Sequence, residues 1–307
     1  MKALVTGGAG FIGSNLVRHL LERGDDVRVL DNFSTGNRRN LEGIEVEIVE
    51  GELRSYERVH NAVRGVEVVF HLGALGSVPR SVQDPLTSSA VNVEGTLNVL
   101  LAARDEGIRR VVFSSSSSVY GSKRELPVTE GLPADPISPY GVAKLAAERY
   151  CVSFSRVYDS FETVALRYFN VFGPRQSPLS QYAAMVPLFI TAIAAGEPVT
   201  IFGDGEQSRD FTYVENVIDA TVRAADAGEA TGRIFNVAAG SPASVNAVAE
   251  AIGRILGKPV ERVFARPRPG DIRDSWADVS AAKDTLGYVP SVDLEEGLRR
   301  TIEHLGV

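Results

Sequence analysis

The chain has 307 residues but only one cysteine, Cys151, so an intrachain disulfide and a cysteine metal cluster are both excluded. We interpret Cys151 as a small buried apolar residue. The four histidines lack the spacing of metal ligands, so no metal site is predicted. No apolar run reaches the roughly 18 residues of a transmembrane helix, and no signal peptide is visible. We therefore expect a cytoplasmic protein without membrane contact.

Basic residues are also in deficit, and the formal net charge is -7. Nucleic-acid binding requires a basic face, so no nucleic-acid partner is expected. An anionic small molecule stays compatible with this charge, because a few arginines can form a local cationic pocket. The length allows a large core with a smaller lobe, and 44% hydrophobic with 23% charged residues is an ordinary globular mixture.

Short β-branched runs alternate with amphipathic stretches over most of the chain. The runs predict strands at Ala3–Thr6, Val27–Asp31, Val46–Val49, Val66–His71 and Arg110–Ser114, and further strands at Thr163–Arg167 and Ile234–Val237. The amphipathic stretches predict helices near Ser14–Arg23, Tyr56–Arg64, Ala90–Glu106 and Ser138–Tyr158. Such alternation indicates an α/β fold with a parallel, doubly wound sheet and right-handed crossovers.

The pattern loosens after Asn170. Residues Gly173–Pro198 carry prolines and polar residues around one helix-like segment, and Ala265–Asp274 is rich in Pro, Gly and Arg. Asp210–Ala239 returns to the strand–helix pattern. We therefore predict a sheet domain of residues 1–169 plus about 210–239. A smaller, discontinuous substrate lobe would comprise about 170–209 plus 240–307.

A glycine-rich turn follows the first predicted strand. Gly7, Gly10 and Gly13 have the spacing G-x-x-G-x-x-G, and a helix begins directly after them. Glycines let the backbone approach a pyrophosphate, and the amides at the helix N-terminus point at its charge. The second strand ends in Asp31, which can accept hydrogen bonds from the adenosine ribose and would repel a 2′-phosphate. The pattern predicts NAD rather than NADP, and Arg38 and Arg39 weaken that preference only slightly.

Tyr140 and Lys144 lie four residues apart at the start of a predicted helix, which Ser138 would cap and Pro139 would begin. This spacing places both side chains on one helical face. A free tyrosine has a pKa of about 10, and a nearby ammonium favours the phenolate and lowers that pKa. The pair therefore indicates a phenolate base, although an aromatic–lysine pair on a helix surface is a common alternative.

A run of serines, Ser114–Ser118, follows the strand that begins at Arg110. Ligands of open α/β sheets bind beyond the carboxyl ends of the strands, so these hydroxyls are candidate site residues. Serine runs also occur as flexible linkers. The apolar strand before this run and the Val-Tyr-Gly after it argue against a linker.

Taken together, these motifs resemble one family over nearly the whole chain. TGGAGFIG, SSSVYG, YGVAK, LRYFNVFGPRQ and GDGEQSRDF identify the chain as a member of the extended short-chain dehydrogenase/reductase family. The resemblance is strongest to UDP-hexose 4-epimerases, and ALGSVPRS resembles the branch that acts on N-acetylhexosamines. It implies a Rossmann-type fold, tightly bound NAD, a UDP-sugar substrate and a homodimer that packs helices near residues 90–106 and 138–158.

The resemblance also implies residue roles. Tyr140 would be the base and acid, Lys144 its electrostatic partner, and Ser116 the hydrogen-bonding partner of the reacting hydroxyl. Cofactor contacts are implied for Gly7, Gly10, Phe11, Ile12, Gly13, Asp31, Asn32, Glu52, Leu53, Leu72, Gly73, Ala74, Asn92, Ser114, Tyr140, Lys144 and Phe169. Substrate contacts are implied for Gly76, Ser77, Ser116, Ser117, Ser118, Tyr140, Asn170, Gln176, Ala184, Met185, Val186, Phe202, Arg209, Arg268, Asp271 and Ser275.

Several of these roles are specific. Phe202 would lie along the uracil, Arg209 and Arg268 would grip the pyrophosphate, and Asp271 would bind the uridine ribose. Glu52 departs from the family's usual aspartate, which contacts adenine. Ser275 stands where a bulky tyrosine confines the pocket to glucose and galactose. A small residue there predicts that UDP-GlcNAc and UDP-GalNAc are accepted, alongside UDP-glucose and UDP-galactose.

The implied reaction is 4-epimerisation through a transient 4-keto sugar, with NAD regenerated in each cycle. A 4,6-dehydratase needs an Asp-Glu pair where this chain has Ser117 and Ser118, which argues against dehydration. A UDP-glucuronate 4-epimerase or decarboxylase would use an arginine against the sugar carboxylate, and Arg80 and Arg175 leave this open. A non-catalytic NAD-sensing protein is a remote alternative, since such proteins usually lose the tyrosine or the lysine.

Overall fold

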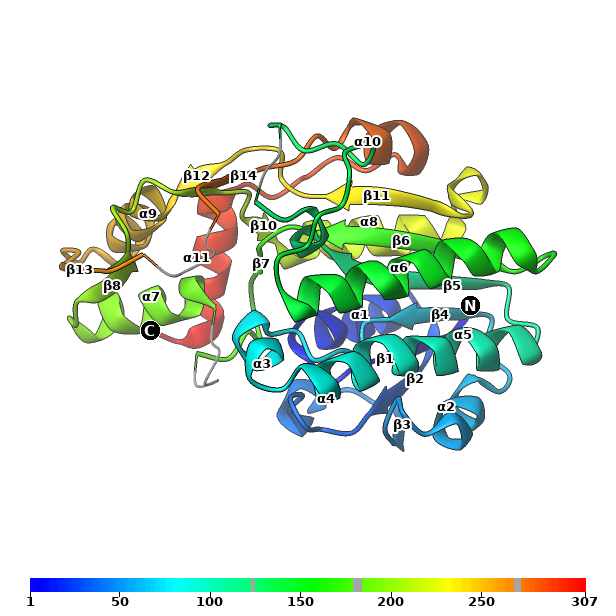
Figure 1. The fold of residues 1–307 in the computed structure, drawn as a ribbon. Coiled ribbons are helices and arrows are strands. Elements are labelled where there is room, and N and C mark those ends of the chain that lie inside the picture. Colours follow the sequence, from blue (N-terminus) through cyan, green and yellow to red (C-terminus); the bar gives the residue numbers. More distant parts are fainter. Residues whose placement is uncertain (123–124, 179–183, 268–271) are drawn as a thin grey trace.

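A seven-stranded parallel sheet forms the centre of the computed structural model, which describes residues 1–122, 125–178, 184–267 and 272–307 (Figure 1). Its strand order is β11-β6-β5-β4-β1-β2-β3. The bounds are β1 (Lys2–Thr6), β2 (Asp26–Asp31), β3 (Glu47–Glu50), β4 (Val68–His71), β5 (Arg110–Ser116), β6 (Glu162–Tyr168) and β11 (Arg233–Val237). All seven predicted strands are present. β5 continues beyond the predicted end at Ser114 because the next two residues pair with β6.

Helices cover both faces of this sheet. One face is covered by α2 (Tyr56–Val63), α5 (Gly95–Asp105) and α6 (Pro139–Val157), whose apolar side chains form one buried cluster with β4 and β5. The other face is covered by α1 (Phe11–Glu22) and α8 (Val214–Asp226). Strands enclosed between two helical layers bury both faces, which explains why they are nearly continuous apolar runs. The predicted fold class, a doubly wound parallel sheet, is confirmed.

The helices near the site begin at capping residues. The Ser138 hydroxyl accepts the Gly141 N–H at 3.1 Å, and Pro139 occupies the first turn of α6, as predicted. The predicted helix at 90–106 is a π-helical turn (Ala90–Glu94) that leads into α5. Two short helices before it were not predicted, α3 (Val78–Gln83) and α4 (Pro85–Ser89), and they are capped by Ser77 and Asp84.

Small sheets and helices lie beyond the carboxyl ends of the large sheet. β7 (Val171–Phe172) pairs with β10 (Thr212–Tyr213), and β8 (Val199–Phe202) pairs with β13 (Arg262–Ala265). β9 (Ser208–Arg209) lies between β12 (Ala243–Ser244) and β14 (Asp274–Ser275). The helices are α7 (Met185–Ala195), α9 (Val245–Leu256) and α11 (Leu294–Leu305), and α7 is the helix-like segment predicted within 173–198. Short 3₁₀ helices span Arg38–Leu41, Ser117–Tyr120 and Gly228–Ala230.

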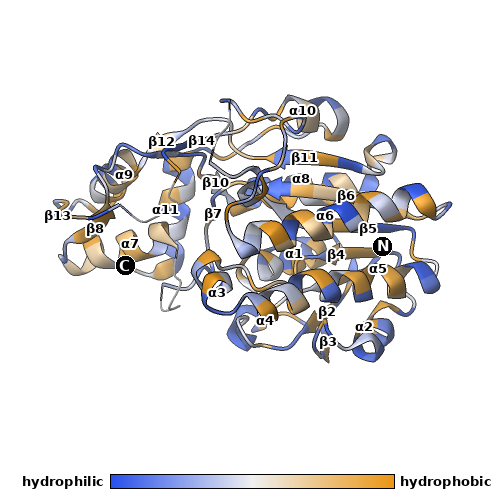
Figure 2. Cartoon of the chain, viewed as in Figure 1, coloured by the Kyte–Doolittle hydropathy of each residue, from blue (hydrophilic) through white to orange (hydrophobic). Residues whose placement is uncertain are grey.

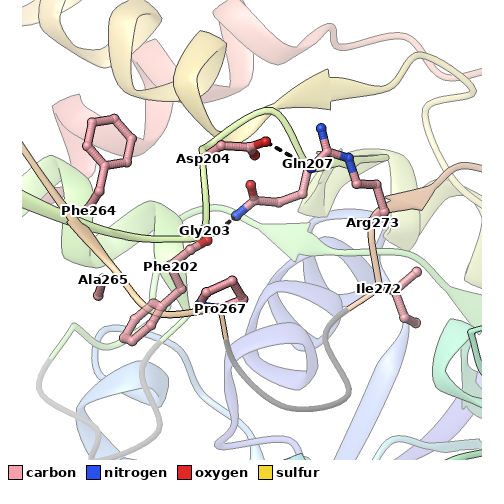
Figure 3. A pocket seen from close by; sticks show the side chains of 9 residues that line it. All are labelled: Phe202, Gly203, Asp204, Gln207, Phe264, Ala265, Pro267, Ile272 and Arg273. Atoms are coloured by element: carbon pink, nitrogen blue, oxygen red, sulfur yellow. Dashed lines mark hydrogen bonds and ion pairs between the residues drawn. The ribbon is translucent and has the colours of Figure 1, made fainter.

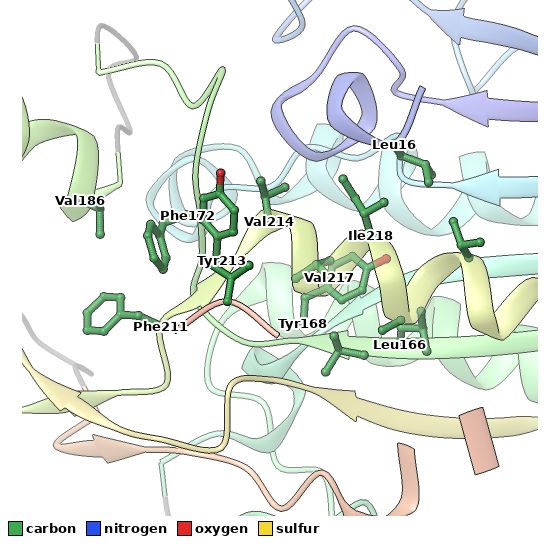
Figure 4. Close-up of a cluster of buried hydrophobic side chains, with 14 of the residues drawn as sticks. Leu16, Leu166, Tyr168, Phe172, Val186, Phe211, Tyr213, Val214, Val217 and Ile218 are labelled. Carbon is green, nitrogen blue, oxygen red and sulfur yellow. The ribbon is translucent and has the colours of Figure 1, made fainter. Parts of the chain in front are cut away.

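One hydrophobic cluster joins the sheet to these outer elements. Figure 4 shows side chains of β6 and α8 continuing into those of β7, β10 and α7, among them Leu166, Tyr168, Phe172, Val186, Phe211, Tyr213 and Val217. α10 (Ser280–Leu286), which the predicted boundary assigns to the lobe, packs against β11 and α8. The division into two domains at the predicted residues stays a prediction. Of the helices in the described ranges, none is both long and apolar enough to cross a membrane.

Candidate active site

The turn between β1 and α1 has room only for glycine at two positions. Gly7 has φ +69°, and a Cβ there would lie 2.7 Å from the Gly73 Cα. A Cβ on Gly13 would lie 2.1 Å from the Gly7 carbonyl oxygen. α1 begins after Gly10 without a side-chain cap, so its first amides, including those of Phe11 and Ile12, face outward as donors. A tight backbone cradle with uncapped amides fits the pyrophosphate of a dinucleotide.

Asp31 ends β2 beside this turn and is buried. Its two carboxylate oxygens accept the Ala9 N–H at 2.9 Å and the Phe33 N–H at 2.8 Å. Each oxygen retains a lone pair for a ribose hydroxyl, and the negative charge disfavours a 2′-phosphate. Arg38 forms an ion pair with Glu50 and lies 3.9 Å from the centre of the Phe33 ring. One of the two arginines that could favour NADP is therefore paired with a carboxylate, and Asp31 fits NAD.

Other residues predicted to contact the cofactor are held by their own neighbours. The Asn32 side chain accepts the Ser34 N–H and hydroxyl at 3.1 and 2.8 Å. Glu52 pairs with Arg54 and is partly exposed. Leu53 is buried and lies against Gly95, where a Cβ would come within 2.8 Å of the Leu53 Cβ. Their roles in cofactor binding stay predictions.

The loop at residues 72–77 contains five predicted contact residues: Leu72, Gly73, Ala74, Gly76 and Ser77. Asn92 braces this loop, since its side chain accepts the Leu75 N–H at 2.8 Å and donates to the Leu75 carbonyl at 3.2 Å. Asn92 belongs to the π-helical turn, an irregularity common at functional sites. The structure thus gives Asn92 a bracing contact beside the predicted cofactor site.

A buried histidine that was not predicted ties this loop to the sheet. His71 bonds Thr6 at 2.7 Å and Thr96 at 2.9 Å through its two ring nitrogens, and the Gly73 N–H donates to the Thr6 hydroxyl at 3.0 Å. Burial lowers the pKa of His71 to about 3, so the imidazole is neutral at physiological pH. His71 stands at the end of β4, and its position after an apolar strand is the signal that could have identified it.

The predicted catalytic residues meet at the carboxyl end of β5. Ser116 interacts with the Tyr140 phenol, whose pKa it lowers, and its hydroxyl accepts bonds from the Ser118 N–H and hydroxyl at 3.2 and 2.9 Å. Lys144, one turn along α6, donates from Nζ to the Ser114 carbonyl at 2.7 Å. The Tyr140 N–H donates to the hydroxyl of Ser81, a residue that the sequence did not single out, at 3.0 Å.

The electrostatics of this group differ from the expectation. Burial raises the pKa of the Tyr140 phenol, and the Ser116 hydrogen bond offsets part of that rise. Burial also lowers the pKa of Lys144 to about 8. The predicted lowering of the Tyr140 pKa by the Lys144 ammonium is therefore wrong for the protein alone, because desolvation dominates and Lys144 is not among the groups that shift the Tyr140 pKa.

Two neighbouring cavities gather seven of the predicted substrate residues that the structure describes. A cavity of about 280 Å³ is lined by Asn170, Gln176, Ala184, Met185, Val186, Phe202 and Arg209, together with residues such as Phe211 and Val245. The seven predicted residues come from the segments just before and after β7, from the start of α7, and from β8 and β9, which only the tertiary fold brings together. The predicted contacts Arg268 and Asp271 lie outside the described residues.

The second cavity, of about 670 Å³, shares Phe202 and Gln207 with the first and is drawn in Figure 3. Aromatic and apolar side chains form much of its wall, with Phe264, Pro267 and Ile272 opposite the Gly203 turn. The Gln207 amide donates to the Phe202 carbonyl at 2.7 Å, and Arg273 pairs with Asp204 at 2.9 Å. A cavity lined in this way by aromatic, apolar and a few polar side chains suits a heterocyclic base.

Two predicted residues are buried within the protein. Ser275 on β14 is 4% exposed and pairs in register with Arg209 on β9. It is not one of the described residues that line the two cavities. Phe169 is fully buried beside Tyr120, with ring centroids 6.2 Å apart. The role of Ser275 as a gate and that of Phe169 beside the nicotinamide stay predictions. Within the described ranges, no cluster of His, Cys, Asp or Glu could hold a metal ion.

Comparison with known proteins identifies the family. Residues 3–238 match the model of the NAD dependent epimerase/dehydratase family. The chain belongs to this family. Its cofactor is NAD, as the glycine turn and Asp31 predicted, and the resemblance to UDP-hexose 4-epimerases is confirmed by the relatives.

These relatives match the chain over almost its full length. It is 41% identical over 313 residues to the UDP-glucose 4-epimerase of Mycolicibacterium smegmatis, covering 99% of this chain and 98% of the relative. The structure of a Thermotoga maritima UDP-glucose 4-epimerase with UDP-glucose superposes with a TM-score of 0.95 at 39% identity, covering 100% and 99% of the two chains. A UDP-N-acetylglucosamine 4-epimerase from Methanobrevibacter ruminantium, in complex with UDP-N-acetylmuramic acid, gives 0.94 at 40% identity and covers 99% and 97%.

The family also includes relatives named for other sugars. The chain is 32% identical over 316 residues to a UDP-glucuronate 4-epimerase of Thermodesulfobacterium geofontis, covering 97% of this chain and 94% of the relative. The names of these relatives share the UDP-sugar class and differ in the sugar.

Proposed function

We propose that the chain is a UDP-hexose 4-epimerase that interconverts UDP-GlcNAc and UDP-GalNAc and also accepts UDP-glucose and UDP-galactose. The observation that carries the proposal is that Ser116 and Tyr140 interact at the end of β5, with Lys144 one helical turn away. Bound NAD supplies reversible two-electron chemistry, and the protein supplies orientation and proton transfer.

Tyr140 acts as the base and acid in this proposal. Its phenol interacts with Ser116, and the positive charges of Lys144 and of a bound nicotinamide would favour the phenolate that burial alone disfavours. A sugar 4-hydroxyl that joins Tyr140 and Ser116 can then pass its proton to this phenolate. Ser118 donates to Ser116 and fixes the orientation of that hydroxyl. Epimerisation requires the same proton to be returned, and a phenol in a buried site retains it until the 4-keto sugar is reduced on its other face.

The residues after Ser116 favour epimerisation over dehydration. Elimination across C5 and C6 needs an acid and a base at the positions of Ser117 and Ser118, and a neutral serine hydroxyl cannot remove a proton from carbon. Both serines lie in the 3₁₀ helix that follows β5. The proposed product is therefore the 4-epimer without loss of water.

Two further observations support a UDP-sugar. The larger cavity has the aromatic and apolar walls that suit a base, and Arg209 lines the adjoining smaller cavity. A guanidinium beside a cavity can bind a pyrophosphate through paired hydrogen bonds. The preference for acetylated sugars rests on the small side chain of Ser275, which the fold places in register with Arg209.

Turnover of the purified protein tests this proposal. We expect the protein to convert each UDP-sugar to its 4-epimer without consuming NAD. We expect Tyr140→Phe to lower kcat by about 10²- to 10⁴-fold. Tyr56→Phe is the control, because Tyr56 lies on α2 with an exposed side chain and belongs to neither the site nor the proposed interface. Equal rates for Tyr140→Phe and the parent would refute the base assignment. A protein that binds NAD yet converts no UDP-sugar would favour the sensing alternative.

A uronate substrate is the second candidate, supported by the 32% identical UDP-glucuronate 4-epimerase. One of the two arginines that left it open has another contact, since Arg175 donates to the Asn15 side chain on α1. Assays with UDP-glucuronate, following both the 4-epimer and released CO₂, distinguish epimerisation, decarboxylation and no reaction. We expect kcat/KM for UDP-glucuronate to lie well below that for the neutral sugars.

We also propose a homodimer. α6 exposes Val142, Tyr150 and Val157, while α3 and α4, which pack against α6, expose Val82 and Leu86. These apolar residues lie on adjacent helices on one side of the sheet (Figure 2). An apolar surface spread over neighbouring helices is typical of an interface between identical subunits.

A further inference from the structure

A buried ion pair lies directly behind the catalytic residues. Tyr140, Lys144 and Glu148 are spaced four residues apart on α6 and so share one helical face. The Glu148 carboxylate is fully buried and accepts two hydrogen bonds from Arg167 on β6, at 2.6 and 2.8 Å. Arg167 is 1% exposed. Two opposite charges are thus enclosed between α6 and the sheet.

The pair also binds β5 between its two site serines. The Ser115 hydroxyl donates to the Glu148 carboxylate at 2.8 Å, and Ser115 is the register partner of Arg167. The neighbours of Ser115 make the other contacts. The carbonyl of Ser114 accepts a hydrogen bond from the Lys144 ammonium, and Ser116 interacts with the Tyr140 phenol. Three consecutive residues of β5 therefore contact three successive residues of one face of α6.

Arg167 extends this arrangement to the next segment. Its guanidinium carbon lies 4.5 Å from the centre of the Tyr120 ring. Tyr120 ends the 3₁₀ helix that begins at Ser117, and its hydroxyl donates to the Asn236 side chain at 2.6 Å. The same guanidinium thus contacts both α6 and the segment that carries Ser117 and Ser118.

The energetics of the Glu148–Arg167 pair favour a role in positioning the catalytic residues over a role in stability. Enclosing two charges costs desolvation energy that a pair only partly recovers, and apolar pairs of similar volume are often equally stable. Proton transfer, in contrast, depends strongly on position, and a misplacement of about 1 Å can reduce a rate by about 100-fold.

We propose that Glu148 and Arg167 are positioning residues, whose buried ion pair fixes β5 against α6 so that Ser116 and Tyr140 meet at the distance required for proton transfer. The inference rests on the proposed epimerase function. Neither residue contacts the substrate in this proposal, and each acts through Ser115, Ser116 or Tyr120.

The same two strands provide a matched control. Arg110 and Glu162 are register partners at the opposite ends of β5 and β6, and their side chains pair at 2.7 Å, with Arg110 1% exposed. This second ion pair shares the strands and the burial of its arginine but lies far along the strands from Ser116. Glu162→Gln therefore shows how the loss of an ion pair between these two strands changes Tm and kcat when the pair lies away from Ser116.

The experiment compares Glu148→Gln, the double variant Glu148→Gln/Arg167→Met and Glu162→Gln in the full-length protein. We expect Glu148→Gln to lower kcat by about 10- to 100-fold with KM changed less than threefold, because binding groups lie elsewhere. We expect the double variant to regain the parent's Tm, since no unpaired charge remains, but not its kcat. The pH dependence of kcat should also shift in Glu148→Gln and not in Glu162→Gln.

Two results would overturn the proposal. One is recovery of kcat together with Tm in the double variant, and the other is an equal loss of kcat in Glu162→Gln and Glu148→Gln. Failure of the proposed function is recognised separately, because the parent would then convert no UDP-sugar. In that case amide hydrogen exchange at residues 114–118 decides: faster exchange in the double variant than in Glu162→Gln supports positioning, and equal exchange refutes it.

Discussion

The sharpest prediction concerns Gly13 in the turn between β1 and α1. A Cβ at this position would lie 2.1 Å from the Gly7 carbonyl oxygen, about 1.3 Å closer than the 3.4 Å at which ordinary contacts begin. The obstacle is backbone on a turn that is itself confined by Gly73. Gly13→Ala must therefore displace the turn, and overpacking of this kind costs about 1 to 3 kcal/mol of folding stability.

The larger effect is expected on the cofactor. Displacing the turn moves the amides at the start of α1 away from the pyrophosphate, and a hydrogen bond to a charged group contributes about 1.5 to 3 kcal/mol. Loss of one such bond weakens NAD binding by about 10- to 100-fold. Titration calorimetry of NAD into stripped protein measures this, with Gly228→Ala as control, since a Cβ there meets no atom within 4 Å. Parent-like Kd and Tm in Gly13→Ala would refute the reasoning.

The remaining predictions concern specificity, pH and assembly. Ser275→Tyr should lower kcat/KM for the acetylated sugars by at least about tenfold and leave kcat/KM for UDP-glucose unchanged. Ser275→Ala should leave kcat/KM unchanged for both kinds of sugar. If Ser275→Tyr used UDP-GlcNAc as well as the parent does, Ser275 would not control access of the acetylated sugars. The pKa of His71 is about 3 in the folded protein and 6.5 in the unfolded chain. Between pH 6.5 and pH 3 unfolding therefore takes up a proton, so the free energy of unfolding should fall as the pH drops below 6.5. Urea unfolding at pH 7 and at pH 5 measures this change, and the free energy of unfolding should fall less in His71→Gln than in the parent. Leu86→Lys with Val142→Glu should yield monomers in light scattering, and a dimer that persists would place the interface elsewhere.

The elements of the sheet domain could be predicted because each carries its signal locally. Apolar runs mark strands buried on both faces, and Ser138 with Pro139 marks the start of α6. The short helices α3 and α4 escaped prediction because five or six residues show too little periodicity. The two-residue strands also escaped prediction. They are too short to show periodicity, and their pairing partners lie far along the chain.

The buried network behind the site could not be derived from the sequence. Glu148 lies four residues after Lys144, which indicates a shared face, but nothing local shows that its partner is Arg167 on a neighbouring strand. His71 and Ser81 were missed because isolated polar residues near apolar segments have many roles. Their contacts with Thr6, Thr96 and Tyr140 join elements distant in sequence.

The sequence by itself determined the chemistry available to this protein: a glycine turn for NAD, an acidic strand end, and a tyrosine four residues before a lysine. These follow from backbone sterics and helical spacing, which act over a few residues. Only the tertiary structure decided how that chemistry is arranged, by pairing Ser116 with Tyr140 and collecting cavity residues from five separate segments. It also decided the electrostatics, because desolvation depends on all that surrounds a group, and here it raises the pKa of Tyr140 where the local pattern predicted a fall.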